Sequence, residues 1–316
     1  MEYTTTLTDK RPIVITIGNF DGIHKGHQRL LHAVQVMADA MGCTPVFVTF
    51  SPHTLLVLRP DINLQCLSTV EERLALVERY TGITESIIIH FTTDVVAMSA
   101  EAFMDELCTH FSIKGLVVGE NFNLGRNRMG NVKFLEEYGQ QHQIRVQSIP
   151  LSEVGQERIS STRIRALISE GAIKEANDLL GHPLVVQGEV VHGNERGRLL
   201  GFPTANIRPD LHKLLPMNGV YAVRVQIAQN SAHNSTTNTR IYPGVANIGI
   251  RPTFNGKERL LEVYLLDVQM DLYGTILSIE FLDHLRSEQR FPGIEALKEQ
   301  IAADVRKARQ ILTIGG

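Results

Sequence analysis

Two histidines lie three residues apart in a glycine-rich segment near the start of the chain. The segment runs from Gly18 to His27 and reads GNFDGIHKGH, so that glycines flank His24 and His27. On a helix, residues three apart share one face, and the first turn of a helix attracts phosphate through its unpaired N–H groups and its dipole. Two imidazoles at such a terminus would add donors to the charge that develops in phosphoryl transfer. A histidine pair alone is more often structural, but its position after a predicted strand favours the catalytic interpretation.

A second cluster of polar residues reads ISSTRIR, from Ile159 to Arg165, and is expected at the start of a helix. Ser161, Thr162 and Arg165 can together make another anion site from hydroxyls, N–H groups and a guanidinium. The alternative is that the hydroxyls are helix caps and the arginine is a surface charge. No GxxxxGK[ST] segment occurs in the chain, which excludes a P-loop as the phosphate cradle.

The most specific stretch of the chain, residues 188–206, reads GEVVHGNERGRLLGFPTAN. It leaves a predicted strand through a loop with three glycines and two arginines, a composition suited to closing over phosphates. Thr204 and Asn206 are two apart, so in an extended segment their side chains point to the same side. Hydroxyl and amide oxygens are neutral ligands suited to a Mg²⁺ ion that already holds substrate phosphates. The tetrapeptide PTAN alone fits a simple turn equally well, so the turn remains an alternative.

A lone carboxylate, Glu262, interrupts the apolar run LEVYLL at 261–266. Such a residue on a strand is most often solvated. A carboxylate beside a substrate hydroxyl would instead act as a general base, as phosphoryl transfer to an alcohol requires.

The elements that must position these residues differ between the two halves of the chain. In the first half, apolar runs typical of strands alternate with helical patterns, which implies parallel pairing in an open, layered α/β sheet. The expected strands are 12–17, 44–49, 86–91, 115–118 and 144–149, and the expected helices are 24–40, 70–80, 99–110, 132–142, 162–170 and 173–180.

The second half has turn-rich connections, which favour antiparallel pairing in a small barrel or sandwich. The expected strands are 184–191, 219–227, 242–249, 260–266 and 275–282, the polar stretch 228–239 is expected as an exposed hairpin loop, and 294–311 as a terminal helix. The change of pattern predicts two domains, 1–182 and 183–316.

Composition narrows the class of protein. The chain has 316 residues, 43% apolar and 21% charged, which is ordinary for a globular protein of about two domains. A net charge of −3, no tryptophan and 6% aromatic residues argue against a nucleic-acid partner. No apolar run reaches the length of a signal peptide or a membrane span, and three cysteines without CxxC spacing indicate neither a disulfide framework nor zinc. We expect a cytoplasmic protein that binds small molecules, without nucleic acid or membrane and with weak self-association at most.

The first half resembles the HxGH nucleotidyltransferases. The pairing of the histidine segment with ISSTRIR, and Phe-Asp ahead of the histidines, is most similar to the adenylyltransferase half of bacterial FAD synthetases. The segment 118–125, VGENFNLG, is similar to that family's GxDFxFG loop, with Asn121 in place of Asp and Leu124 in place of Phe. The resemblance implies catalytic roles for His24 and His27, and binding of nucleotide or phosphate by Gly18, Asn19, Phe20, Asp21, Asn121, Ser161, Thr162 and Arg165.

The second half resembles the riboflavin kinases from about residue 184 to residue 311. The similarity is carried by HGxxxGRxxGFPTAN at 192–206, GVYA at 219–222, NIG at 247–249, the Glu262 strand and DLYG at 271–274. It implies a six-stranded antiparallel barrel, with Glu262 as base toward the ribityl 5′-hydroxyl and Thr204 and Asn206 as ligands of Mg²⁺ on ATP. Binding of nucleotide or flavin is implied for Gly193, Arg198, Gly201, Pro203, Thr204, Asn206 and Arg286.

In this order on one chain, the two halves resemble the bifunctional FAD synthetase family over nearly the whole length. The resemblance implies that ATP phosphorylates riboflavin to FMN, and that a second ATP adenylylates FMN to FAD with release of pyrophosphate. A rival interpretation makes the first half a regulatory module that senses FAD, against which the intact His24, His27, Ser161, Thr162 and Arg165 argue. A second rival makes the barrel a nucleic-acid binder, which would need a basic stripe with interleaved aromatic residues.

Overall fold

The structure is a computed structural model that describes residues 1–150, 153–154, 157–193, 197, 201–227, 240–253, 256–268 and 270–314. It divides into two compact units, Met1–Ser161 and Thr162–Gly316. The domain boundary near residue 182 stays a prediction. No helix among the described residues is long and apolar enough to cross a membrane.

The first unit is built on a six-stranded sheet in the order β1-β4-β3-β2-β5-β6. Five strands are mutually parallel, as the alternating pattern predicted. They are β2 (Ile13–Ile17), β3 (Thr44–Ser51), β4 (Glu85–His90), β5 (Ile113–Gly119) and β6 (Arg145–Ile149). Because β3 and β4 lie on one side of β2 while β5 and β6 lie on the other, the strand order reverses at β2.

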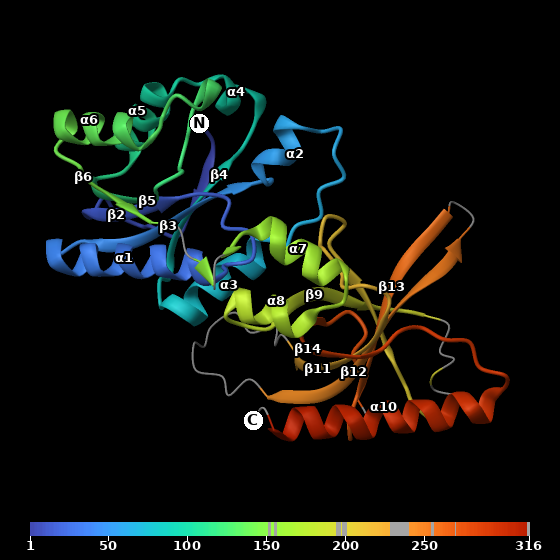
Figure 1. Ribbon diagram of the computed structural model, residues 1–316. Helices are drawn as coiled ribbons and strands as arrows, with labels where there is room; N and C mark the ends of the chain where they lie inside the picture. The colour runs from blue at the N-terminus through green and yellow to red at the C-terminus, as the bar shows by residue number, and fades with distance from the viewer. Residues whose placement is uncertain are drawn as a thin grey trace. The chain divides into compact units, whose positions relative to one another are not determined.

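Helices cover both faces of this sheet (Figure 1). α1 (Lys25–Met41) packs Val34 and Met37 against Val14 and Val117 on one face, and α3 (Val70–Thr81) lies beside it. The apolar faces of α5 (Ala100–His110) and α6 (Val132–His142) join the larger core on the opposite face. Burial on both faces explains why the central strands read as continuous apolar runs. The short helices are α2 (Thr54–Leu58), α4 (Thr93–Ala97) and η1 (Arg126–Arg128).

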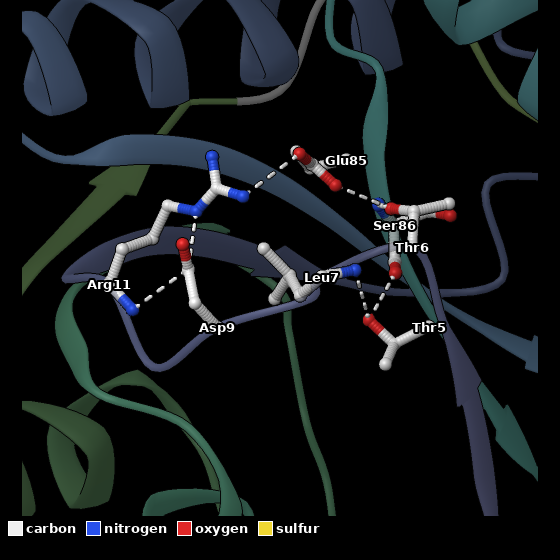
Figure 2. Close-up of polar contacts among 7 residues, drawn as sticks. All are labelled: Thr5, Thr6, Leu7, Asp9, Arg11, Glu85 and Ser86. Atoms are coloured by element: carbon white, nitrogen blue, oxygen red, sulfur yellow. Dashed lines mark hydrogen bonds and ion pairs between the residues drawn. The ribbon is translucent and has the colours of Figure 1, made fainter.

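An edge strand, β1 (Tyr3–Thr5), pairs antiparallel with β4 and was not expected from the sequence. Figure 2 shows how the turn after it is fixed: Thr5 Oγ1 donates to Ser86 O at 2.8 Å, and Ser86 N donates to Thr6 Oγ1 at 2.8 Å. Arg11 pairs with Asp9 and reaches Glu85. A strand of three residues is too short to show an apolar pattern, so the sequence does not predict it.

Several helices begin at side-chain caps or end at glycines. Thr69 and Glu72 form a capping box at the start of α3, and Ser99 caps α5 by accepting from Ala102 N. Gly171 and Gly181 adopt φ of 79° and 78°, the left-handed conformation that ends the helices before them.

The second unit is a closed barrel in the order β10-β13-β12-β11-β14-β9, with every pair antiparallel. The predicted small barrel is confirmed. Its elements are β9 (Leu184–Val191), β10 (Ala205–Pro209), β11 (Gly219–Ile227), β12 (Ile241–Thr253), β13 (Gly256–Leu265) and β14 (Ile276–Arg286). A two-stranded hairpin, β7 (Glu153–Val154) with β8 (Glu157–Arg158), precedes this unit.

Three helices accompany the barrel: α7 (Ser161–Ser169), α8 (Ile173–Leu180) and α10 (Ile294–Ile314). α10 runs along the outside of the barrel (Figure 1), where Ala308 packs against Val220, Ala222 and Val245. Tyr221 and other large residues fill the interior. The expected hairpin loop 228–239 lies outside the described residues.

Candidate active sites

The first candidate site lies where the strand order of the α/β sheet reverses. β2 and β5 are parallel neighbours, so the loops that follow them, 18–24 and 120–125, leave the same edge of the sheet. Ligands of open α/β sheets bind at such switch points, outside the carboxyl ends of the strands. Asn121 is exposed in the turn after β5, where Asn123 Nδ2 donates to its carbonyl oxygen at 2.8 Å. The fold therefore brings Asn121 to the same edge as the histidine segment.

The two histidines form one stacked pair at the start of α1. His24 is the N-cap residue, and its Nδ1 accepts from His27 N–H at 3.3 Å. The ring centroids are 3.5 Å apart with an interplanar angle of 16°. Because Nδ1 of His24 accepts, the neutral ring carries its proton on Nε2, which makes that atom a donor.

His27 is neutral in this position. Burial, and then the nearby His24 and Arg73, hold the pKa of His27 well below its ordinary value. Its Nδ1 is buried and has no hydrogen-bond partner among the described residues. Buried polar atoms are nearly always satisfied by protein, water or ligand, so this atom indicates a ligand position at the helix start.

The stability of the first unit should weaken as the pH falls below about 6.5, the ordinary imidazole pKa. In that range an unfolded chain binds a proton at His27, whereas the folded chain, with its lowered pKa, does not, so the free energy of unfolding falls with pH. Above that value His27 contributes no pH dependence. Urea midpoints of the parent and His27→Gln, measured from about pH 8 to about pH 5, should show a smaller loss in the variant. Parallel curves would contradict the lowered pKa.

The loop before the histidines is anchored by its own polar residues. Asp21 accepts from the backbone N–H groups of Leu67 and Ser68, each at 3.0 Å, and Ser161 Oγ donates to the Asp21 carbonyl oxygen at 2.9 Å. The Asn19 amide exchanges two hydrogen bonds with Thr54, at 2.8 and 3.0 Å. These contacts place Asn19, Asp21 and Ser161 together as loop anchors, and their predicted contacts with nucleotide stay predictions.

The remaining predicted residues of this site are placed as follows. Phe20 is buried with φ of 50° and packs against the Phe47 ring and the His27 ring. Gly18 lies against the Phe20 ring, since a Cβ at Gly18 would stand 3.0 Å from that ring. Thr162 and Arg165 lie on α7 in the second unit, and their part in this site stays a prediction.

The second candidate site contains three polar side chains in a row across adjacent strands of the barrel. Glu262 on β13 lies directly opposite Asn206 on β10 and opposite Asn247 on β12. Directly paired residues share one face of a sheet, and Asn247 Nδ2 donates to Glu262 Oε2 at 3.4 Å. The neighbouring Leu261 and Val263 are buried on the opposite face. Glu262 is thus held between two amides, and Asn206 lies in a strand rather than in a turn.

Two glycines of the specific stretch approach the proposed metal ligands closely. A Cβ at Gly193 would overlap the Asn206 amide, and a Cβ at Gly197 would stand 3.1 Å from Thr204 Oγ1. Thr204 and Asn206 offer neutral oxygens, and the described residues contain no group of three His, Cys, Asp or Glu that could hold a metal. The residues therefore fit a Mg²⁺ ion whose charge is balanced by nucleotide phosphates, not an ion bound by protein alone.

A pocket of about 630 Å³ opens beside Thr204. This volume is within the usual range for small-molecule sites. At its rim, the Tyr273 ring stacks on the His192 ring with centroids 3.9 Å apart. Its lining residues are Val190, Gly201, Pro203, Thr204, Ala205, Leu265, Val268, Met270, Asp271, Leu272 and Tyr273.

Arg286, expected to bind nucleotide or flavin, pairs with a residue of α10 in the second unit. Its guanidinium pairs with Asp304 on α10, with Nε and a terminal nitrogen each 2.9 Å from Oδ2, and lies 5.6 Å from the Phe291 ring centroid. Contact of Arg286 with flavin or nucleotide stays a prediction. Arg198 lies outside the described residues.

The sequence analysis missed Asn247, although it noted the surrounding NIG motif. An asparagine in an apolar run gives no sign of which carboxylate it faces. Only the register of β12 against β13 brings it to Glu262.

An α/β unit with a histidine pair at the switch point of its sheet, followed by a barrel that sets a carboxylate beside neutral oxygens, fits a two-site phosphate-transferring enzyme. Comparison with known proteins agrees: the family model for FAD synthetase matches residues 6–163, and the family model for riboflavin kinase matches residues 180–312. The chain belongs to the bifunctional riboflavin kinase/FMN adenylyltransferase family, which confirms the resemblance of both halves.

Relatives match over nearly their full length. The chain is 37% identical over 298 residues to the bifunctional riboflavin kinase/FMN adenylyltransferase of Escherichia coli K12, covering 94% of this chain and 92% of the relative. It is 34% identical to the enzyme of the same name from Haemophilus influenzae, covering 93% and 92%. A crystal structure described as a macrolide-efflux protein from Streptococcus pneumoniae has a TM-score of 0.83 and 31% identity, covering 96% of each chain.

Proposed function

We propose that this chain makes FAD in two ATP-dependent steps. The second unit phosphorylates riboflavin to FMN, and the first unit transfers an adenylyl group from a second ATP to FMN with release of pyrophosphate. The observation that carries the proposal is the row Asn206–Glu262–Asn247, which sets a carboxylate beside a proposed metal ligand in the half that matches riboflavin kinase.

In the kinase reaction, Glu262 would accept the proton of the ribityl 5′-hydroxyl as that oxygen attacks the γ-phosphorus of ATP, and ADP would leave. Asn247 would orient the carboxylate through its hydrogen bond to Oε2. Thr204 and Asn206 would hold Mg²⁺, which when bound neutralises charge on the phosphates. The pocket beside Thr204 would hold the nucleotide, with Gly201 and Pro203 in its wall.

In the adenylyl transfer, a phosphate oxygen of FMN would attack the α-phosphorus of ATP, and pyrophosphate would leave. The attacking phosphate is already ionised, so no general base is needed and catalysis consists of positioning and charge stabilisation. His24, with its proton on Nε2, and the N–H groups at the start of α1 would donate to the transferred phosphate. Ser161, Thr162, Arg165 and Asn121 would contribute to binding.

The three cysteines, Cys43, Cys66 and Cys108, form no disulfide in the structure. Reduced cysteines support the cytoplasmic location that belongs to this proposal, because disulfides are rare in that compartment.

The test is to incubate the purified chain with riboflavin, ATP and Mg²⁺ and to separate the products by chromatography. FMN should form first and FAD should follow, and supplied FMN should give FAD and pyrophosphate without riboflavin. Chelation of Mg²⁺ should stop FMN formation. Formation of FMN without any FAD would leave the first half as a sensing module and overturn the proposed adenylyl transfer.

A further inference from the structure

A buried arginine lies behind the histidine site and takes no part in the mechanism given above. Arg73 is on the inner face of α3 and is 3% exposed. One terminal nitrogen of its guanidinium donates to Asn19 O at 2.6 Å and to Thr49 Oγ1 at 2.7 Å. Its Nε donates to Thr69 O at 3.3 Å. The side chain thus ties the loop after β2 to the end of β3 and to α3.

The acceptors of this guanidinium are unusual for a buried cation. Those that the structure gives it, Asn19 O, Thr49 Oγ1, Phe50 O and Thr69 O, are all neutral oxygens. Burial lowers the pKa of Arg73, and the charge of Asp21 opposes this. Arginine nevertheless stays protonated in proteins, and a buried charge whose hydrogen-bond acceptors are all neutral is costly to stability, although the charges of Asp21, Glu71 and Glu72 reduce that cost.

Anchoring the loop does not by itself require a charge. Asn19 is already tied to Thr54, and Asp21 to the backbone at 67–68, by hydrogen bonds that involve no cation. A full positive charge at this place gives an additional effect, because it acts over several ångströms in a poorly solvated environment. After burial and His24, it is the third cause that lowers the pKa of His27.

We propose that Arg73 is a positioning residue of the adenylyl-transfer site, which fixes the turn from Asn19 to Asp21 and places a buried positive charge behind the phosphate-binding edge. This inference rests on the proposed function of the first unit. The hydrogen bonds hold the loop that leads into the His24–His27 pair. The charge attracts the phosphates of the two substrates, and it adds to burial and to His24 in disfavouring a proton on the His27 imidazole.

The experiment compares Arg73→Met, which removes both charge and donors, with Arg73→Lys, which keeps the charge but not the forked donors. Arg79→Met is the matched control, since Arg79 lies on the same helix, is exposed, and has its guanidinium over the Tyr80 ring, 5.3 Å from the ring centroid. FAD formation from FMN, riboflavin phosphorylation by the same protein, and the titration of the His27 ring by NMR are measured for each.

Arg73→Met should lower kcat for FAD formation by ~10²-fold, the effect of a misplaced reacting group, and leave riboflavin phosphorylation unchanged. The pKa of His27 should rise in Arg73→Met and stay low in Arg73→Lys, because only the lysine keeps the charge. A purely structural role predicts that both variants shift His27 alike. Arg79→Met should match the parent in all three measurements.

Two results would overturn the inference: FAD formation by Arg73→Met within about threefold of the parent, far short of the ~10²-fold loss, or a His27 pKa that rises equally in both variants. If Arg73→Met unfolds the first unit, the His27 titration in Arg73→Lys decides, since a raised pKa there removes the role of the charge. Failure of the proposed function is a different result. In that case the parent makes no FAD, and the His27 titration still reports whether Arg73 sets its charge state.

Discussion

Glu262→Gln should lower kcat for FMN formation by ~10²–10⁴-fold, the contribution of a general base, while KM for riboflavin changes little. Glutamine keeps the shape of the side chain and can still bond Asn247, but it cannot accept the ribityl proton. A loss confined to kcat is the mark of an interaction made in the transition state. Steady-state kinetics with riboflavin and ATP measure this directly.

The control for this variant is Glu189→Gln. Glu189 is an exposed strand carboxylate of the same barrel and pairs with Arg208 at 2.7 Å. That variant should behave as the parent, and both variants should convert supplied FMN to FAD at the parental rate. An unchanged kinase kcat in Glu262→Gln would remove Glu262 from the mechanism and make it a solvated carboxylate.

His27→Ala should lower the rate of FAD formation from FMN by ~10²–10³-fold, the effect of losing one group that stabilises developing charge. The substitution removes the ring that stacks on His24 and the buried Nδ1 that has no hydrogen-bond partner among the described residues. Riboflavin phosphorylation should be nearly unchanged, because its site lies in the second unit. Both activities can be followed on one preparation by chromatography of the flavins.

His32→Ala controls for the loss of an imidazole from α1, since His32 is exposed on the same helix. It should retain both activities. FAD synthesis by His27→Ala within a few-fold of the parent, against the ~10²–10³-fold expected, would show that the adenylyl-transfer site was assigned wrongly.

The sequence predicted the parts of the fold that repeat a clear pattern. Continuous apolar runs and capped amphipathic helices predicted the parallel sheet, and turn-rich alternation predicted the barrel. β1 was missed because a strand of three residues carries little periodicity, and β10 because its sequence, ANIRP, buries only Ile207 and ends in proline. Thr204 and Asn206 could be proposed together as metal ligands because they lie two residues apart in one short stretch of sequence.

Roles that depend on tertiary contacts were beyond the sequence. Arg73 follows two glutamates on an amphipathic helix and reads as a surface charge, although its guanidinium is buried beside Asn19. Asp21 sits in the histidine motif, and nothing in the sequence shows that its carboxylate also accepts from the backbone at 67–68. Motif membership indicates that a residue is needed, and only the fold shows what it touches.

Residues of the candidate kinase site and residues of the barrel core alternate along β13, so one register places both sets. Leu261, Val263 and Leu265 fill the buried face while Glu262 lies on the other, so loss or gain of one residue within the strand would exchange the two sets. Such a change would bury the carboxylate and expose three apolar side chains in a single step. A one-residue insertion or deletion is therefore expected to cost the barrel more within β13 than in the loops that connect its strands.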